Sequence, residues 1–328
     1  MRRGYVVEVL CVGEALAVFV PAEPGPADEV RTWRRTVGGA ESNVARALAA
    51  LGVPSAFAGA VGDDAFGRAL VGELAAEGVD VRGVRADPAR PTGLYVKENG
   101  ASGTVMRYYR AGSAASAMGP ELLSTVDLDG VRLVHLSGIT PALSPGCHDL
   151  VRALLDAPRE NRLVSFDVNW RPALWAGRDP AEVAALAARA DLVLTGEDEA
   201  GQVWGTGEPA RLRALLPGPA TVVVKHGERG ATLLERGRAP VFEPALAVDV
   251  VEPVGAGDAF AAGFLAATLR GEDARTRLRA GHLQAAATLL TRDDVSAPLP
   301  RGVVATLLRA GEQEWAAARL SGGELVHQ

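Results

Sequence analysis

The chain has 328 residues and a mass of 34.0 kDa, a size that suits two ordinary domains or one large α/β domain with a small appendage. Hydrophobic residues make up 48% and charged residues 23% of the sequence, which excludes a disordered chain, and 38 glycines are too few for a collagen. The net charge of −6 offers no general attraction to nucleic acid or to an anionic membrane, so an anionic ligand needs local positive charge.

Cys11 and Cys147 are the only cysteines, and both lie in apolar segments, so we expect reduced core residues. Glu8 and Glu14 interrupt the apolar run near the N-terminus, and no run reaches the ~18 to 20 apolar residues of a membrane span. These features predict a cytoplasmic protein that binds neither nucleic acid nor membranes. Of 34 basic residues only Lys97 and Lys225 are lysine, which we attribute to nucleotide bias.

Short apolar runs alternate with longer stretches of helical period along the chain. The predicted strands are 5–12, 55–61, 131–137, 162–168, 191–195, 220–225 and 230–235. The predicted helices are 42–52, 64–78, 146–156, 179–189, 257–270, 274–291 and 301–318. This alternation predicts a layered α/β/α core in a single domain that spans 1–328.

Two stretches in the N-terminal third, 15–37 and 92–110, break this rhythm. They contain short β segments such as LAVFV and GTVMRYYR, separated by Pro, Gly and Asn turns. We expect them to pair into a small sheet that stands off the core as a lid. Because one chain alone would expose the edges and aromatic residues of such a sheet, we also expect a homo-oligomer.

The sharpest motif is VDVVEPVGAGDAFAAGFLAATL, residues 248–269. A strand-like run ends at Pro253, and Gly255, Ala256 and Gly257 precede Asp258 at the start of a helix. Small residues let the backbone approach a ligand, and free N–H groups at a helix start favour an anion. A dinucleotide-binding fingerprint also has glycines there, but it belongs in the first βα unit, and a carboxylate inside the cradle would repel phosphate.

Asp258 therefore needs another role. We expect the N–H groups and the dipole of the helix to hold Asp258 ionised, so that it accepts a hydroxyl proton while adjacent amides stabilise a transferring phosphoryl group. The alternative is a simple helix cap, and the spacing alone does not separate the two.

The segment GAGDAFAAG resembles the second signature of the PfkB or ribokinase-like sugar kinases, and VGGAESNVARALAALG (37–52) resembles the first. VGDDAFG (61–67) also fits, and the similarity runs from Gly13 to the C-terminal helices. Within the family the sequence is most similar to 2-keto-3-deoxygluconate kinases, through RYYRAGSAAS (107–116), HLSGITPALSP (135–145), DVNWRPALW (167–175) and EPVGAGD (252–258). The resemblance implies a three-layer ribokinase-like core, Asp258 as the catalytic base, and an anion hole formed by the amides of Gly255, Ala256 and Gly257.

Candidate substrate contacts gather in RYYRAG. Tyr108, Tyr109 and Arg110 offer two hydroxyls and a fork of donors suited to a carboxylate; the alternative is that the tyrosines only pack the lid. By resemblance, the other substrate contacts are Gly38, Gly39, Asn43, Tyr95 and Asp294, with Asp293 competing with Asp294 for its role and Ser42 as a helix cap.

In DVNWR, strand alternation predicts that Asp167, Asn169 and Arg171 lie on one side of a strand that runs toward the ligand edge of the sheet. Arg171 then meets a substrate carboxylate or a phosphate, unless it is an ordinary surface arginine. We therefore assign Asn169 and Arg171 to both the substrate and the nucleotide.

On the nucleotide side, TVVVKHGERGATLL (221–234) predicts a strand, a turn and a second strand. The resemblance places ATP along Lys225, Gly227 and Gly230, next to Gly255 and Gly257. In TGEDEAG (195–201), Gly196 replaces the family's Asn and Glu199 keeps the acid that holds Mg²⁺ through water, so the nucleotide supplies most metal ligands. The family also allows a monovalent cation, while Glu252 and Pro253 stand where many relatives have Asp and Thr.

Three functions remain open at this point. The first is ATP-dependent phosphorylation of 2-keto-3-deoxygluconate on its terminal hydroxyl, and the second is the same reaction on a neutral sugar such as fructose or ribose. The third is a sugar-binding regulator without catalysis. Tyr108, Tyr109 and Arg110 argue against the second, and Asp258 with its glycines argues against the third.

Overall fold

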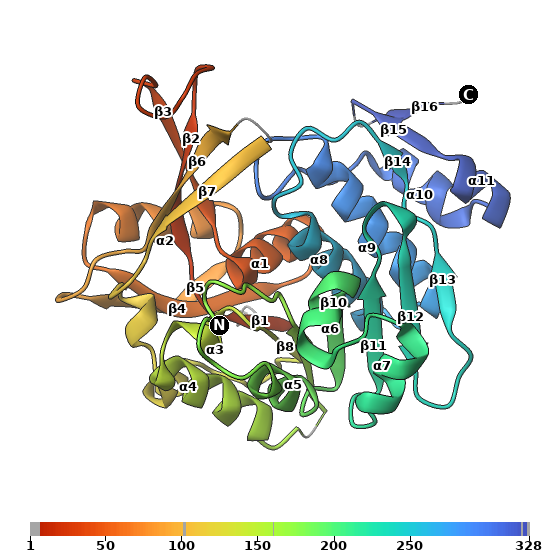
Figure 1. Ribbon diagram of the computed structural model, residues 1–328, viewed down its shortest axis with the longest axis horizontal. Coiled ribbons are helices and arrows are strands. Elements are labelled where there is room, and N and C mark those ends of the chain that lie inside the picture. Colours follow the sequence, from red (N-terminus) through yellow and green to blue (C-terminus); the bar gives the residue numbers. More distant parts are fainter. Residues whose placement is uncertain (1–6, 101–102, 160, 323, 327–328) are drawn as a thin grey trace, which may run out of the picture.

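The computed structural model describes residues 7–100, 103–159, 161–322 and 324–326, and its centre is a nine-stranded sheet (Figure 1). Neighbouring strands of this sheet are parallel, except that β12 is antiparallel to both of its neighbours, β11 and β13. In sheet order the strands are β13 (Val241–Glu243), β12 (Ala231–Glu235), β11 (Thr221–Lys225), β10 (Leu192–Gly196), β9 (Leu163–Asp167), β8 (Leu133–Ser137), β1 (Val9–Val12), β4 (Ser55–Gly62) and β5 (Asp80–Asp87).

Helices cover both faces of this sheet, as the alternating pattern predicts. One face packs against α1 (Ala40–Ala50), α2 (Ala65–Ala76), α8 (Ala256–Leu269) and α9 (Ala274–Leu289). The other packs against α3 (Thr140–Leu143), α4 (Pro145–Asp156), α5 (Ala181–Ala187), α6 (Glu197–Trp204) and α7 (Pro209–Leu215). The predicted three-layer core is therefore confirmed.

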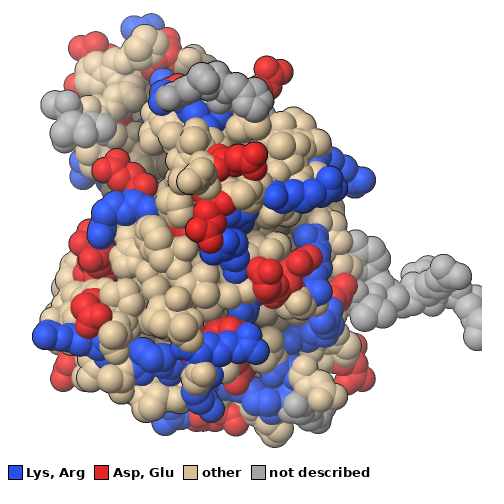
Figure 2. Space-filling view, turned by 90° about the vertical axis from the view of Figure 1, so that its right-hand side faces the viewer, with Lys and Arg blue, Asp and Glu red and all other residues tan. Residues whose placement is uncertain are grey.

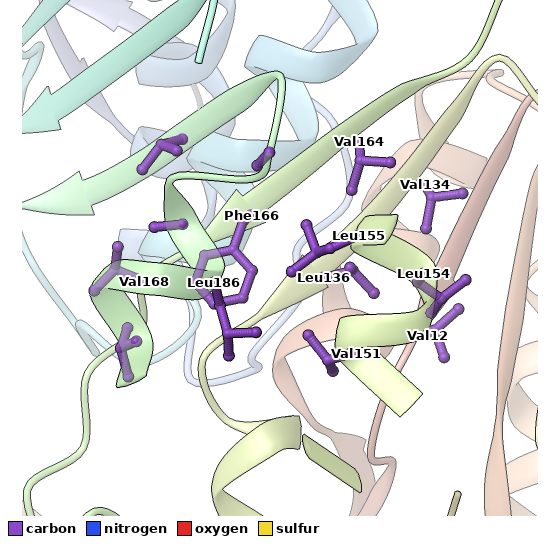
Figure 3. Close-up of a cluster of buried hydrophobic side chains, with 14 of the residues drawn as sticks. Val12, Val134, Leu136, Val151, Leu154, Leu155, Val164, Phe166, Val168 and Leu186 are labelled. Atoms are coloured by element: carbon purple, nitrogen blue, oxygen red, sulfur yellow. The ribbon is translucent and has the colours of Figure 1, made fainter. Parts of the chain in front are cut away.

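The apolar runs of the central strands become a core on each face because parallel strands are buried on both sides. Figure 3 shows Val134, Leu136 and Phe166 of the sheet against Leu154 of α4 and Leu186 of α5. Cys11 and Cys147 are buried free thiols, as expected. This packing holds the carboxyl ends of β1, β8, β9, β10 and β11 at one edge of the sheet.

The two stretches predicted as a lid form a separate four-stranded sheet in the order β3-β2-β6-β7 (Figure 1). Its strands are β2 (Leu16–Pro21), β3 (Trp33–Gly38), β6 (Leu94–Gly100) and β7 (Gly103–Tyr109). The β2–β6 pair is parallel and the two outer pairs are antiparallel. Strand β2 directly follows β1, so the chain passes from the core sheet into the lid within a few residues.

The predicted helix 301–318 is wrong in one respect, because it is two helices, α10 (Arg301–Arg309) and α11 (Glu312–Ala317). Ala310 and Gly311 between them have extended backbone, and glycine is a poor helix former. Trp315 of α11 is fully buried in a separate C-terminal cluster. This region also has a small sheet of β14 (Ala247–Val248), β15 (Arg319–Ser321) and β16 (Glu324–Val326).

Strand β5 was not predicted, because it is a half-buried edge strand in which Arg82 and Arg85 interrupt the valines. Three 3₁₀ turns complete the described elements: η1 (Ala115–Ala117), η2 (Pro120–Thr125) and η3 (Gly227–Arg229). No helix in the described ranges has the length and apolar character needed to cross a membrane. On the face drawn in Figure 2, basic and acidic side chains are mixed.

Candidate active site

A cavity of about 450 Å³ lies between the carboxyl ends of the parallel strands and the inner face of the lid. Its walls come from β9, β11, α1, the start of α8, and the lid strands β6 and β7. It brings together most of the site residues predicted from the sequence: Gly39, Asn43, Tyr95, Tyr108, Arg110, Asn169, Arg171, Glu199, Lys225, Gly255, Gly257, Asp258 and Asp294.

Asp258 lies in the first turn of α8 and faces this cavity. Its Oδ2 accepts a hydrogen bond from Asn43 Nδ2 of α1 at 2.8 Å. Contrary to our expectation that the helix start keeps Asp258 fully ionised, burial raises its pKa to about 7, and Asp167 adds to the shift while Asn43, Lys225 and Arg171 oppose it. An aspartate that titrates near neutral pH suits a general base better than a passive helix cap does.

The start of α8 depends on Gly255, the residue before the helix. Its φ is +85°, in the left-handed region that favours glycine, and a Cβ there would lie 2.1 Å from the Asp294 carbonyl oxygen. Gly255 and Gly257 line the cavity, whereas Ala256 does not, and its N–H donates to Pro253 O at 3.3 Å. In the structure two of the three expected amides, not all three, belong to residues at the cavity.

Lys225, at the end of β11, reaches across to the end of β9. Its Nζ lies 2.9 and 3.2 Å from the two carboxylate oxygens of Asp167, and both side chains are largely buried. Burial lowers the pKa of Lys225, but Asp167, Glu199 and Asp258 raise it by more, so the net shift is upward and the lysine stays protonated. The cavity therefore holds a permanent cation close to Gly257.

The strand predicted through DVNWR is shorter than expected, because β9 ends at Asp167. Asn169 has φ +37°, the only positive value among the described non-glycine residues, so the chain turns here and strand alternation does not continue to Arg171. All three side chains still line the cavity. Arg171 is half exposed and lies 3.7 Å from Glu199, whose other oxygen accepts the Gly196 N–H at 2.7 Å.

On the lid side, Asp294 is the aspartate that belongs to the cavity. It is 3% exposed, accepts a hydrogen bond from the Tyr95 hydroxyl, and lies 2.7 Å from Lys97 Nζ. Burial and the Asp294 carboxylate raise the pKa of Tyr95, so this tyrosine remains a hydrogen-bond donor. Asp293 instead pairs with Arg34 at the surface. The structure thus distinguishes Asp294, which lines the cavity, from Asp293, which lies at the surface.

Strand β7 also separates the two tyrosines of RYYR. Tyr108 lines the cavity, whereas Tyr109 is 58% exposed on the opposite face of the lid sheet, because successive side chains of a strand point to opposite sides. The Arg110 guanidinium lies 4.7 Å from the centre of the Tyr108 ring. Arg110 is not a free cation, since its Nη1 donates to Glu14 Oε2 at 2.7 Å.

Three further glycines of the prediction lie outside this cavity. Gly38 sits behind it, where a Cβ would come within 3 Å of the Tyr95 hydroxyl and the Asp294 carboxylate. Ser42 does not cap α1 but donates to the carbonyls of Gly38 and Gly39. The other two, Gly227 and Gly230, flank the turn between β11 and β12 and have positive φ values.

A second, more open groove of about 840 Å³ adjoins that turn. Glu197, Asp198 and Glu208 line it, together with His226 and Arg229. Glu197 pairs with Arg229 and also lies 3.1 Å from His226 Nδ1. Lys225 and Asp258, the predicted cation and base, line the first cavity and not this groove.

Two residues of this cavity region escaped the sequence analysis. Glu14 was noted only as a break in an apolar run, although a lone carboxylate between two buried strands is itself a signal of a polar site. Lys97 was ascribed to composition, yet both lysines of the chain form buried ion pairs with aspartates at this site. Asp167 was placed near the site but given no partner.

The chain has a mostly parallel sheet between helical layers and a β lid, which together form the ribokinase-like fold. The cavity between sheet and lid holds a helix start, a lysine and a titrating aspartate, as a carbohydrate kinase of this fold requires. The chain belongs to the pfkB family of carbohydrate kinases, whose family model matches residues 7–301.

Relatives within this family are named for different sugars. The chain is 35% identical over 309 residues to 2-dehydro-3-deoxygluconokinase from Thermoproteus tenax. This alignment covers 90% of the present chain and 93% of the relative. The chain is 32% identical over 266 residues to fructokinase from Rhizobium leguminosarum bv. trifolii, covering 79% and 78%. A sugar kinase from Pyrococcus horikoshii, solved in complex with ATP, superposes with a TM-score of 0.76 at 26% identity, covering 88% of this chain and 95% of that chain. Identity alone does not choose the sugar.

We predict that Lys97→Met lowers the free energy of unfolding by about 3–5 kcal/mol, because it leaves the buried Asp294 carboxylate without its cation. Urea unfolding measures this loss. Arg34→Met is the matched control, since it removes the exposed partner of the adjacent Asp293 and should cost about 1 kcal/mol or less. Equal losses in the two variants would contradict the prediction.

Proposed function

We propose that this chain catalyses ATP-dependent phosphorylation of 2-keto-3-deoxygluconate (2-dehydro-3-deoxygluconate) at its terminal hydroxyl, giving 2-keto-3-deoxy-6-phosphogluconate and ADP. The observation that carries the choice of sugar is Arg110, a guanidinium at the cavity wall beside Tyr108 on the lid. A guanidinium has five N–H donors in a fixed fork, so a donation to Glu14 leaves others for a carboxylate. A relative with the same activity in its name supports the proposal.

In the proposed reaction, Asp258 takes the proton of the terminal hydroxyl as that oxygen attacks the γ-phosphorus of ATP. The new P–O bond forms as the bond to the β-phosphate oxygen breaks, and ADP leaves with that electron pair. Asn43 orients the Asp258 carboxylate through its 2.8 Å hydrogen bond. The N–H groups of Gly255 and Gly257 at the start of α8 donate to the oxygens of the transferring group.

The nucleotide side of the cavity suits a triphosphate. Lys225 supplies a permanent charge there, and a Cβ on Gly257 would lie 3.7 Å from its Nζ, so phosphate oxygens can approach both. Arg171, half exposed at the rim, adds a second cation. We assign Asn169, whose buried Oδ1 has no hydrogen-bond partner among the described residues, to the ligand as well.

Mg²⁺ fits this site when it is bound mainly by the nucleotide and not by protein side chains. No cluster of three or more His, Cys, Asp or Glu side chains able to hold a metal occurs in the described part of the chain, and one Glu199 oxygen is engaged by Gly196. Glu199 would therefore act through water, with phosphate oxygens as the main ligands. When bound, the ion neutralises phosphate charge during transfer.

We predict that Asp258→Asn lowers kcat by about 10²–10⁴ while substrate affinity changes little, because the amide cannot take the proton. In the parent enzyme kcat should rise with pH through about 7, since only the ionised carboxylate is a base and burial raises its pKa to about 7. Steady-state rates from pH 5.5 to 8.5 test both statements. A variant within twofold of the parent would exclude the role.

Arg110→Ala should lower kcat/KM for 2-keto-3-deoxygluconate by about 30-fold or more, the loss expected when a buried anion has no cation. The matched substrate is 3-deoxyfructose, which has a CH₂OH in place of the carboxylate, and its kcat/KM should fall much less. Arg110→Lys should rescue only in part, because lysine lacks the planar fork. Equal losses on both sugars would mean that Arg110 only shapes the lid, and a parent enzyme that prefers 3-deoxyfructose would reject the sugar-acid assignment.

We also propose that lids pair between subunits. Strand β7 is an edge of the lid sheet, and Val105 and Tyr109 on its outer face are 47% and 58% exposed. We predict a dimer by light scattering at micromolar concentration and a shift toward monomer in Val105→Lys, because edge-strand lysine opposes strand pairing. A strict monomer of the parent chain would contradict this arrangement.

A further inference from the structure

We propose that Glu14 sets the charge that the sugar end of the cavity presents, and so sets how strongly an acidic sugar is preferred over its neutral counterpart. The inference rests on the proposed function, because it concerns the same sugar end. Its starting point is the buried ion pair between Glu14 Oε2 and Arg110 Nη1, 2.7 Å apart, with side chains 1% and 10% exposed. Both residues line the cavity.

Glu14 sits where the chain passes from β1 of the core into β2 of the lid, with groups of several elements facing it. Tyr108 comes from β7, Glu41 from α1 and Cys147 from α4, whereas Arg110 and Ser113 belong to the segment that follows β7. Its Oε1 has no hydrogen-bond partner within the described ranges. Arg110 is therefore the one cation among these groups, and Glu41 is a second carboxylate.

This arrangement leaves Glu14 able to change its charge near neutral pH. Burial and the Glu41 carboxylate raise the pKa of Glu14, Arg110 and the Ser113 hydroxyl oppose the shift, and the net value is about 7. When Glu14 is ionised, it cancels the charge of Arg110. When it is protonated, Arg110 keeps its full charge for an incoming anion.

A substrate carboxylate that binds Arg110 therefore comes close to a second carboxylate. Repulsion between the two favours protonated Glu14, so binding of an acid and protonation of Glu14 strengthen each other by linkage. A neutral sugar has no charge to repel, and its affinity should respond little. Glu14 thus restrains the preference for sugar acids at high pH.

A buried ion pair elsewhere in the chain provides a structural control. Glu243 and Arg279 are each 3% exposed and 3.0 Å apart, and they pack between β13 and α9. Glu243 also pairs with a second cation, Arg275. Neither Glu243 nor its partners line the cavity, so Glu243→Gln tests the general effect of a lost buried carboxylate.

The experiment compares kcat/KM for 2-keto-3-deoxygluconate with kcat/KM for 3-deoxyfructose at pH 8, in the parent, Glu14→Gln and Glu243→Gln. We expect Glu14→Gln to raise the acid-to-neutral ratio about tenfold, the size of one pKa unit of coupling. Glu243→Gln should leave the ratio unchanged. A ratio that stays the same or falls in folded Glu14→Gln, checked by its thermal unfolding, would overturn the proposal.

A second measurement needs no change at Glu14. In the parent, the ratio should fall as pH rises from 6 to 8.5, because ionised Glu14 cancels Arg110, and titration of Asp258 acts on both sugars and cancels in the ratio. In Arg110→Met this slope should disappear. A ratio independent of pH in the parent would overturn the proposal even if Glu14→Gln does not fold.

The two proposals fail in different ways. A parent enzyme with an acid-to-neutral ratio below one rejects the sugar-acid substrate. The change of that ratio in Glu14→Gln tests Glu14 whatever the starting value. A high parent ratio without any change in Glu14→Gln keeps the substrate and rejects the role of Glu14.

Discussion

The close contact between Gly255 and the backbone of Asp294 fixes most of this site. No side chain fits at Gly255, and its left-handed backbone starts α8 with Asp258 facing the cavity. The same Asp294 holds Tyr95 and Lys97 of the lid through its carboxylate. A single loop thus links the proposed base to a lid strand that lines the cavity, so a displacement at 294 would move both.

Burial of several acids is the second constraint. Asp167 and Asp294 each have a lysine, Asp258 accepts a hydrogen bond from the amide of Asn43, and Glu14 shares Arg110 with the cavity. Burial raises the pKa of Asp258 and of Glu14 to about 7, although nearby cations oppose the shift in both. Asp167 and Asp294 each hold a lysine in place, and Asp258 and Glu14 can exchange a proton near neutral pH.

Much of the site could be predicted from the sequence because its signals are local. The GAGD segment must start a helix with exposed N–H groups, and apolar runs between helical stretches require a sheet covered on both faces. These features place Asp258 and Lys225 at the same sheet edge. The lid, too, is visible in the sequence as a break in periodicity, and its strands 16–21, 33–38, 94–100 and 103–109 follow that prediction.

Contacts between distant segments depended on the tertiary structure. Sequence patterns identified Arg110 as a cation but not Glu14 as its partner, 96 residues away, and left Asp293 and Asp294 undivided. They also placed Asn169 on a strand that ends before it, and gave Asp258 the pKa of an exposed helix start. Local sequence determines backbone direction and the chemistry available. Which charges meet, and how much water they lose, is decided only when the sheet, helices and lid close around them, because burial and pairing are properties of the packed chain.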